Sequence, residues 1–585
     1  MTGSHARIHR LARGLAKWYP RSVEPTTELR RSLSFLESDL RAETVVRAGY
    51  VAALPSALLV ICALSVAVPS LPLAATLPAA AGIGLGTTHA LHRLPVAAAT
   101  LRRTRALGDA PGLVARAALR LRLDATPERA AIFAARTGDG PLARSLAAHA
   151  DRTRLGPAAG FEAFADEWQP WFPALERSVS LLSAAVEAPT GERESALDRA
   201  LETILDGARS EMADFAGNVR GPASGIYAFG VLLPLALVGV LPAARAAGVV
   251  VPATVFIVLY DVVLPVALVV AGVWLLLRRP IAVPPPRVTR AHPDVPSGVA
   301  RGIGAGICGL GVGAIAGSLV ATWATPVAAA GLGTGAALAV HYRPMRAVRR
   351  EVREIESGLA DSTAVVGRRV GAGESVETAI GAAAEATTGR TAELFESAAG
   401  VQRRLRVPIS RAFLGDHGAL SEVPSPRARA TAELFSVAAR EGRPSGPTLV
   451  TLADHLTELR RVQADARREL AAITGTLAHT AALFGPLVGG ATVAMATQMA
   501  ATEPTAVESA SLGGTAAPGA ATLAPSTLGI AVGVYVLALA VILTAVATGL
   551  DRGLDRSLVG YRIGLAMCSA TAAYLVAFLG ASMLF

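Results

Sequence analysis

The chain of 585 residues contains one lysine, Lys17, and every other basic side chain is arginine. A P-loop needs a lysine that reaches the β- and γ-phosphates of a nucleotide. No glycine-rich loop precedes Lys17. The chain therefore does not hydrolyse ATP through a P-loop.

Charged residues are also scarce: they make up 17% of the chain, against about a quarter of a typical soluble domain. Apolar residues reach 52%, and the mean hydropathy is +0.45. Because the charges cluster, long windows remain almost uncharged, and about 20 such residues cross the hydrocarbon core as a helix. The hydropathy predicts nine spans, at 48–68, 72–91, 224–243, 249–277, 299–322, 324–341, 476–500, 526–550 and 562–584.

The motifs of common catalytic and metal sites are missing. The three cysteines lie far apart inside predicted spans, so we expect no disulfide framework and no metal cluster. The patterns His-Glu-x-x-His, Cys-x-x-Cys and Gly-x-Ser-x-Gly do not occur. His89 and His92 alone would make a poor metal site, and packing is the better interpretation. We expect no enzyme activity, no cofactor and no metal.

Arginine placement predicts the membrane orientation, because basic residues near span ends resist translocation. With the N-terminus in the cytoplasm, Arg245 is the one basic residue outside it, and Phe585 ends the chain on the far side. The predicted organisation is a cytoplasmic arm (1–47), transmembrane pair 1 (48–93), helical domain 1 (94–222), transmembrane pair 2 (223–277), a Pro-rich linker (278–298), transmembrane pair 3 (299–341), helical domain 2 (342–475), transmembrane pair 4 with external loop 501–525 (476–550), and a basic hairpin with the last span (551–585).

The net charge of +10 does not indicate a nucleic-acid partner. Residues 94–222 carry sixteen basic and seventeen acidic side chains, and residues 342–475 carry twenty and seventeen. Neither region is strongly basic. The excess lies beside the predicted bilayer, in the arm and the linker, where it records topology.

Both polar regions are rich in Ala, Leu, Arg and Glu without alternating β-branched runs, which predicts an all-α fold. They share an order of elements. A Gly-x-Gly turn follows Arg136 and Arg369, a later helical hairpin turns near residues 189 and 444, and a span with a central proline follows, at Pro234 and Pro486. We infer a duplicated unit of two spans, one helical domain and two spans, with the ninth span added.

Two features inside the spans are candidates for function. Asp261 is the one acid near the middle of a span, and such a carboxyl is a functional candidate by default, although a protonated or paired structural acid is the better interpretation. Glycines recur every four residues along 302–317, which lets helices approach closely. Packing within the chain is favoured over a homodimer seam, which is left open.

The architecture resembles the F-domain proteins of type II secretion and type IV pilus systems, the polytopic platform proteins of the inner membrane. The resemblance is carried by the topology, by Gly371 and Gly373 with Glu374 and Val376, and by the stretch from Glu441-Gly442 to Thr448-Leu449. The long form with two units and many spans is similar to the archaeal branch, which includes pilus and archaellum platforms.

The resemblance implies a scaffold in the cell membrane whose cytoplasmic domains engage a hexameric secretion ATPase and whose spans guide pilin-like subunits into a filament. No active site is carried over. We expect the charged turns around Asp139, Glu187, Glu374 and Glu441 to form part of the surface that faces the ATPase.

Two other classes compete with this interpretation. A transporter with its site between the two repeats predicts polar residues converging at the midplane, where the sequence offers mainly Asp261. A membrane sensor predicts a large external domain or an output enzyme. The 501–525 loop is too small to be such an external domain, and the sequence contains no motif of an output enzyme.

Overall fold

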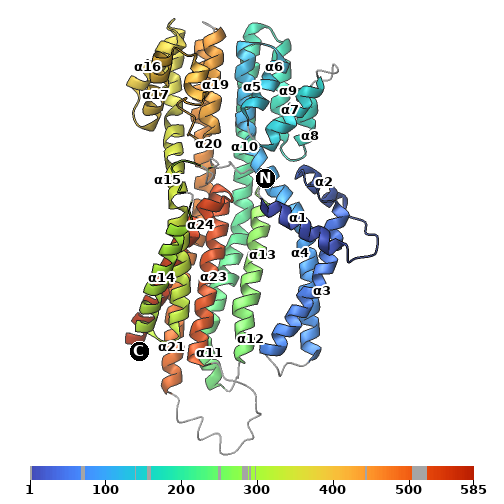
Figure 1. Cartoon of the computed structure of the whole chain (residues 1–585), viewed down its shortest axis with the longest axis vertical. Helices are drawn as coiled ribbons and strands as arrows, with labels where there is room; N and C mark the ends of the chain where they lie inside the picture. The colour runs from blue at the N-terminus through green and yellow to red at the C-terminus, as the bar shows by residue number, and fades with distance from the viewer. Residues whose placement is uncertain are drawn as a thin grey trace, which may run out of the picture. The chain divides into compact units, whose positions relative to one another are not determined.

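In a computed structural model of the chain, the structure describes residues 3–67, 73–138, 140–153, 160–247, 252–279, 288, 292–296, 298–441, 445–502 and 524–584. Within these ranges every regular element is a helix (Figure 1). The all-α expectation is therefore confirmed for the described part of the chain.

The chain forms two compact units. The first consists of Met1–Thr104, Ala243–Val263 and Ala500–Ala524, and the second of Arg105–Pro242, Leu264–Met499 and Pro525–Phe585. The second unit thus combines both predicted helical domains with most of the predicted spans. This grouping differs from the predicted separation of polar and membrane parts, because long helices run without a break from one part to the other.

In the first unit, the N-terminal arm folds onto the first span. Its helices are α1 (Gly3–Ala16), α2 (Thr27–Phe35), α3 (Ala42–Ala67), most of α4 (Leu73–Leu107), α12 (Ala253–Ile257) and the π-helix η2 (Val258–Val263). Thr26 caps α2 by accepting from the Leu29 amide. Leu29 and Leu33 pack against Val45 and Val46 of α3. The arm therefore contributes to a small hydrophobic core.

The second unit contains the remaining helices. In its polar part these are α5 (Ala110–Leu123), α6 (Pro127–Thr137), α7 (Pro141–Thr153), α8 (Gly160–Trp168), α9 (Pro173–Glu187), α10 (Thr190–Tyr227), α16 (Val376–Ala386), α17 (Arg390–Leu405), α18 (Ile409–Leu414), α19 (Pro426–Glu441) and α20 (Ser445–His479). In or leading into its apolar part they are η1 (Ala228–Leu232), α11 (Leu233–Ala246), α13 (Leu264–Leu277), α14 (Ala300–Val320), α15 (Ala324–Gly371), η3 (Thr480–Phe484), α21 (Gly485–Thr502), α23 (Pro525–Arg552) and α24 (Arg556–Leu584).

Helix α15 joins two segments that the sequence analysis separates. The predicted span 324–341 and the predicted helix 348–366 form one helix of 48 residues. Pro344 lies inside it and removes one backbone hydrogen bond. The buried face nevertheless continues through Met345, Val348 and Val352, which pack with Val295. This continuous burial outweighs the local cost of the proline.

Two other long helices each contain a π-turn where they enter the apolar part. The elements α10, η1 and α11 follow one another without a break, as do α20, η3 and α21 (Figure 1). In each case a proline, Pro234 or Pro486, comes two residues after the π-turn. Proline lacks an N–H and its ring crowds the carbonyl four residues earlier. The wider turn accommodates the ring without ending the helix.

Seven helices of the described part are long and apolar enough to cross a membrane: Ala42–Cys62, Gly191–Leu241, Ala253–Leu277, Ala300–Val320, Ser445–Met499, Pro525–Arg552 and Arg556–Leu584. The chain thus has the character of a multi-pass membrane protein. The two further predicted spans, 72–91 and 324–341, lie in α4 and in the first part of α15. Both are rich in alanine, glycine and threonine, so they are less apolar than the other seven.

The glycines of α14 face α15 of the same chain. A Cβ added at Gly309 would lie 2.6 Å from the Leu332 carbonyl oxygen, and one at Gly313 would lie 2.4 Å from the Ala328 oxygen. Close backbone approach of this kind is what small residues allow in membrane helix pairs. The glycine stripe is therefore used for packing within the chain, as the sequence analysis favours.

The hydrophobic core of the second polar region also takes in a residue of the first. The aromatic centre of this core is Phe395, Phe413 and Phe435, with ring centroids 5.7–6.2 Å apart. Leu119 of α5, from the first polar region, belongs to the same cluster. The two polar regions are therefore packed against each other at α5.

Candidate coupling site at the distal helix ends

Four helices of the second unit end near one another, at the end of this unit that lies opposite its apolar segments (Figure 1). We define the distal cap as the last turn of α5, the α9–α10 turn, the α15–α16 turn, the last turn of α19 and the first turn of α20. A Cβ added at Gly446 would lie 2.5 Å from the Gly371 amide nitrogen, so the end of α15 touches the start of α20. The 30 residues from Tyr342 to Gly371 correspond to about 45 Å of helix. The cap thus lies far from the predicted membrane surface.

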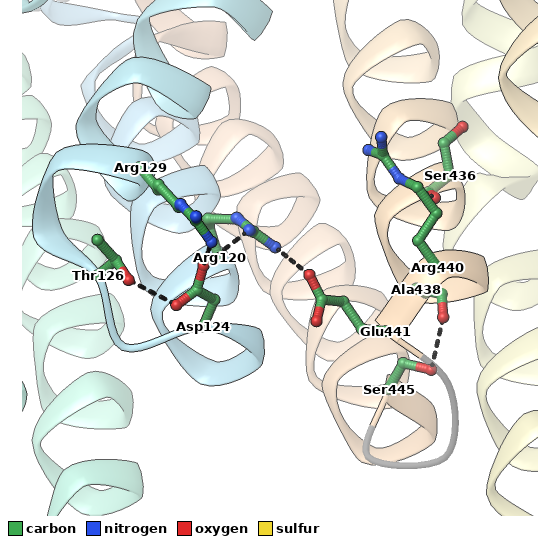
Figure 2. Close-up of polar contacts among 9 residues, drawn as sticks. All are labelled: Arg120, Asp124, Thr126, Arg129, Ser436, Ala438, Arg440, Glu441 and Ser445. Atoms are coloured by element: carbon green, nitrogen blue, oxygen red, sulfur yellow. Dashed lines mark hydrogen bonds and ion pairs between the residues drawn. The ribbon is translucent and has the colours of Figure 1, made fainter.

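Glu441 connects two helices of the cap. Arg120 of α5 contacts the Glu441 carboxylate at 3.1 Å and that of Asp124 at 3.0 Å (Figure 2). Asp124 also accepts hydrogen bonds from the Thr126 hydroxyl and from Arg129. These two hydrogen bonds, with the positive charge of Arg120, lower the pKa of the Asp124 carboxyl despite its partial burial. Glu441 is therefore engaged in an ion-pair network between the two polar regions.

Glu374 and Glu187 occupy the other turns of the cap. Glu374 accepts a hydrogen bond from the Arg369 guanidinium at 2.9 Å. It directly follows Gly373, whose φ of 101° favours glycine. The following residue, Ser375, caps α16 through the Thr378 amide. Glu187 is exposed at the last position of α9, and Arg193 secures that turn by donating to two backbone carbonyls.

Asp139, the remaining predicted residue, lies outside the described residues. Its neighbours Gly138 and Gly140 lie beside Arg116 and Asp109, because a Cβ at Gly138 would be 2.8 Å from the Arg116 Nη2. Those two side chains belong to the start and middle of α5, whereas the cap is at its C-terminal end. The structure therefore places Glu187, Glu374 and Glu441 at the same end of the helices, but not Gly138 and Gly140, the neighbours of Asp139.

Asp261 lies in η2, partly buried within the span Ala253–Leu277. Its Oδ1 has no hydrogen-bond partner in the described part of the chain. Its backbone carbonyl is four residues before Pro265, so it loses the usual helical donor. Among the described residues, no three His, Cys, Asp or Glu side chains lie close enough together to hold a metal ion. His92 instead contacts the Val46 carbonyl oxygen at 3.1 Å.

A buried ion pair at the other end of the polar region was not expected from the sequence. Arg349 of α15 is 5% exposed and contacts Asp555 at 2.5 Å. Asp555 also accepts from the Ser557 and Leu558 amides and thereby caps α24. Burial opposes ionisation, but Arg349, the Leu558 amide and the Ser557 hydroxyl lower the pKa of Asp555. The pair ties α15 to the connection between α23 and α24.

The arrangement can transmit force, since it connects a charged cap to apolar helices through continuous rods. Cross-links hold the rods together: Arg122 of α5 donates to Thr451 of α20 at 3.1 Å and pairs with Asp198 of α10. Arg209 of α10 pairs with Glu458 of α20. No family model, curated protein or solved structure matches this chain. Its own residues are therefore the basis for assigning a function.

Proposed function

We propose that this protein is a non-enzymatic membrane platform of a type IV pilus-like or type II secretion-like assembly machine. In this role it couples a hexameric cytoplasmic secretion ATPase to the insertion of pilin-like subunits into a surface filament. The observation that carries the proposal is the continuity of α10, α15 and α20 between the distal cap and the apolar helices. The lack of a P-loop fits a protein that is moved by a partner.

Helix continuity gives this coupling a physical basis. Helix α10 has 38 residues and is therefore about 57 Å long. A rod of that length tilts as a unit when its end is pushed, provided that neighbouring rods hold it. The ion pairs of Arg122 and Arg209 with neighbouring helices supply that support. A push at the cap would thus reach the spans that follow η1 and η3.

The proposed topology has nine spans, with 72–91 and 324–341 added to the seven most apolar helices. The N-terminus is cytoplasmic and the C-terminus is outside, in the cytoplasmic membrane of an archaeal-type cell. Duplication is supported by two repeated features. Gly140 and Gly373 both have a positive φ, 96° and 101°, and both long rods have a π-turn two residues before a proline.

The cap is the proposed surface for the ATPase, and charge reversal tests this. We expect Glu187→Arg to reduce co-purification of the ATPase by about tenfold, because an attractive contact becomes repulsive. Glu374 and Glu441 are unsuited to the first test, since their reversal would also break their pairs with Arg369 and Arg120.

Asp214→Arg is the matched control. Asp214 is exposed on α10, 24 residues beyond Thr190, so the same charge change occurs about 36 Å from the cap. Membrane insertion should be normal in both proteins. If the Glu187→Arg protein retains the ATPase as well as the control does, the cap is not the docking surface.

A further inference from the structure

The second unit contains a cavity of about 360 Å³ between α5 and the α6–α7 turn on one side and α15, α19 and α20 on the other. Ligand sites for small molecules have volumes of about 300–1,000 Å³. Its wall combines the leucines of α5, α19 and α20 with several polar side chains. The apolar part of the wall is formed by Leu119, Leu434, Leu452, Leu456 and Leu459.

His455 lines this cavity from the polar half of α20, about 20 residues before the predicted span. It is 6% exposed, and neither ring nitrogen has a hydrogen-bond partner among the described residues. Burial lowers its pKa to about 4, and the charges of Arg427 and Arg116 add to the effect. At neutral pH the ring is therefore uncharged and offers one donor and one acceptor.

Gln463, eight residues after His455 on α20, is a second polar side chain of the cavity wall. Its Nε2 is buried without a hydrogen-bond partner in the described part of the chain. Buried polar groups in folded proteins are nearly always hydrogen-bonded, and unsatisfied ones destabilise the fold. Molecules inside the cavity, water or a bound ligand, must therefore supply the hydrogen bonds of these two groups.

Arginines give the cavity its charge. Arg116, Arg427 and Arg429 line it together with the acids Asp109 and Glu356. Glu356 already accepts from the Ser425 hydroxyl at 2.6 Å and contacts Arg427 at 3.4 Å. A guanidinium has five donors, so Arg427 keeps donors for a second acceptor. The planar fork of arginine matches the oxygens of a phosphate group.

We propose that this cavity binds a nucleoside monophosphate without hydrolysing it. The base lies among the leucines and exchanges hydrogen bonds with His455 and Gln463, and the phosphate contacts the arginines. Such a mode, with a base held between apolar side chains and its edge read by polar groups, is known for nucleobase pockets. The ligand would join α5 to α19 and α20, and so stiffen the connection between the two polar regions. This site does not depend on the platform function.

The test is binding to the full-length protein in lipid nanodiscs, measured by calorimetry and by the thermal unfolding midpoint. The probes are AMP, GMP and inorganic phosphate. We expect saturable binding of AMP or GMP below about 1 mM and none of phosphate alone. His455→Leu and Gln463→Leu should each weaken nucleotide binding about tenfold, the loss expected for one hydrogen bond in a buried site.

Arg440→Ala is the control variant, because Arg440 is exposed and is not part of this cavity. Each leucine variant removes an unsatisfied polar group, so we expect both proteins to fold. If one variant does not fold, the binding measurement on the other variant tests the proposal. Three results would overturn the proposal: no saturable binding of either nucleotide, equal binding of phosphate and nucleotide, or wild-type affinity in the folded leucine variants.

Discussion

The hydroxyl of Tyr535 in α23 makes a hydrogen bond between two helices of the apolar part, and this bond can be tested by a single substitution. Tyr535 is fully buried and donates to the Gly230 carbonyl oxygen in η1. In an α-helix that carbonyl would accept from residue 234, which is Pro234 and has no N–H. The hydroxyl therefore replaces the missing donor. We predict that Tyr535→Phe destabilises the protein by leaving this carbonyl unsatisfied.

The expected cost is about 1–2 kcal/mol. An unsatisfied buried carbonyl costs about 1–3 kcal/mol, whereas hydrogen bonds between membrane helices average about 0.6 kcal/mol and reach about 1.7 kcal/mol. Pro234→Ala restores a backbone N–H to the helix. In that background we expect Tyr535→Phe to cost less than about 0.5 kcal/mol, so the two changes couple by about 1 kcal/mol.

The assay is denaturant unfolding in mixed micelles of the four proteins of this double-mutant cycle. Tyr574→Phe is the control: Tyr574 is equally buried and donates to the Gly529 carbonyl at 2.8 Å. Gly529 lies inside α23, where residue 533 has an N–H, so losing the hydroxyl should cost only about 0.5 kcal/mol. Equal losses for Tyr535→Phe with and without the proline would refute this explanation.

Two further predictions concern the polar part of the second unit. Gly446→Ala should destabilise the protein by about 1–3 kcal/mol, because the new Cβ would meet the Gly371 backbone at 2.5 Å. Its control is Gly381→Ala in α16, where a Cβ would have nothing within 4 Å and should stabilise the protein by about 0.5–1 kcal/mol. Equal effects of the two substitutions on thermal unfolding would contradict the close contact between α15 and α20. His455 takes up its proton at a lower pH in the folded state than the usual value of about 6.5, so its contribution is fully present above pH 6.5 and is lost as the pH falls toward about 4. Unfolding midpoints measured across this window should fall less steeply in His455→Leu, and parallel curves would count against the assignment.

Local features of the fold could be predicted from the sequence. The break after Gly371 and the start of a helix near Ser375 are properties of neighbouring residues, since glycine ends one helix and serine caps the next. The glycines of α14 were likewise assigned to packing within the chain. Short-range rules are enough for such elements.

Contacts between distant residues could not be predicted in this way. Arg120 and Glu441 are 321 residues apart, and nothing near either residue reveals the other. Because of that pair, Glu441 is part of an internal network and less available to a partner than the sequence suggested. Similarly, Leu119 belongs to a core built mainly from the other polar region. Such joints depend on the packing of whole helices.

His455 shows the same limit at the proposed ligand site. In the sequence it is an ordinary polar residue of a helix, and the four helices that enclose it come from separate parts of the chain. Only their packing shows that its ring is buried and unpaired beside a cavity. The absence of a P-loop excluded one kind of nucleotide chemistry, but it did not exclude nucleotide binding.

The central claim is that this protein is the platform on which a surface filament is assembled. Its most direct test is deletion of the gene, with electron microscopy of the cell surface and fractionation of the pilin-like subunits. We predict that the filaments disappear while the subunits stay in the membrane, and that the wild-type gene restores assembly. Filaments of normal number and length on the deletion cells would contradict the claim.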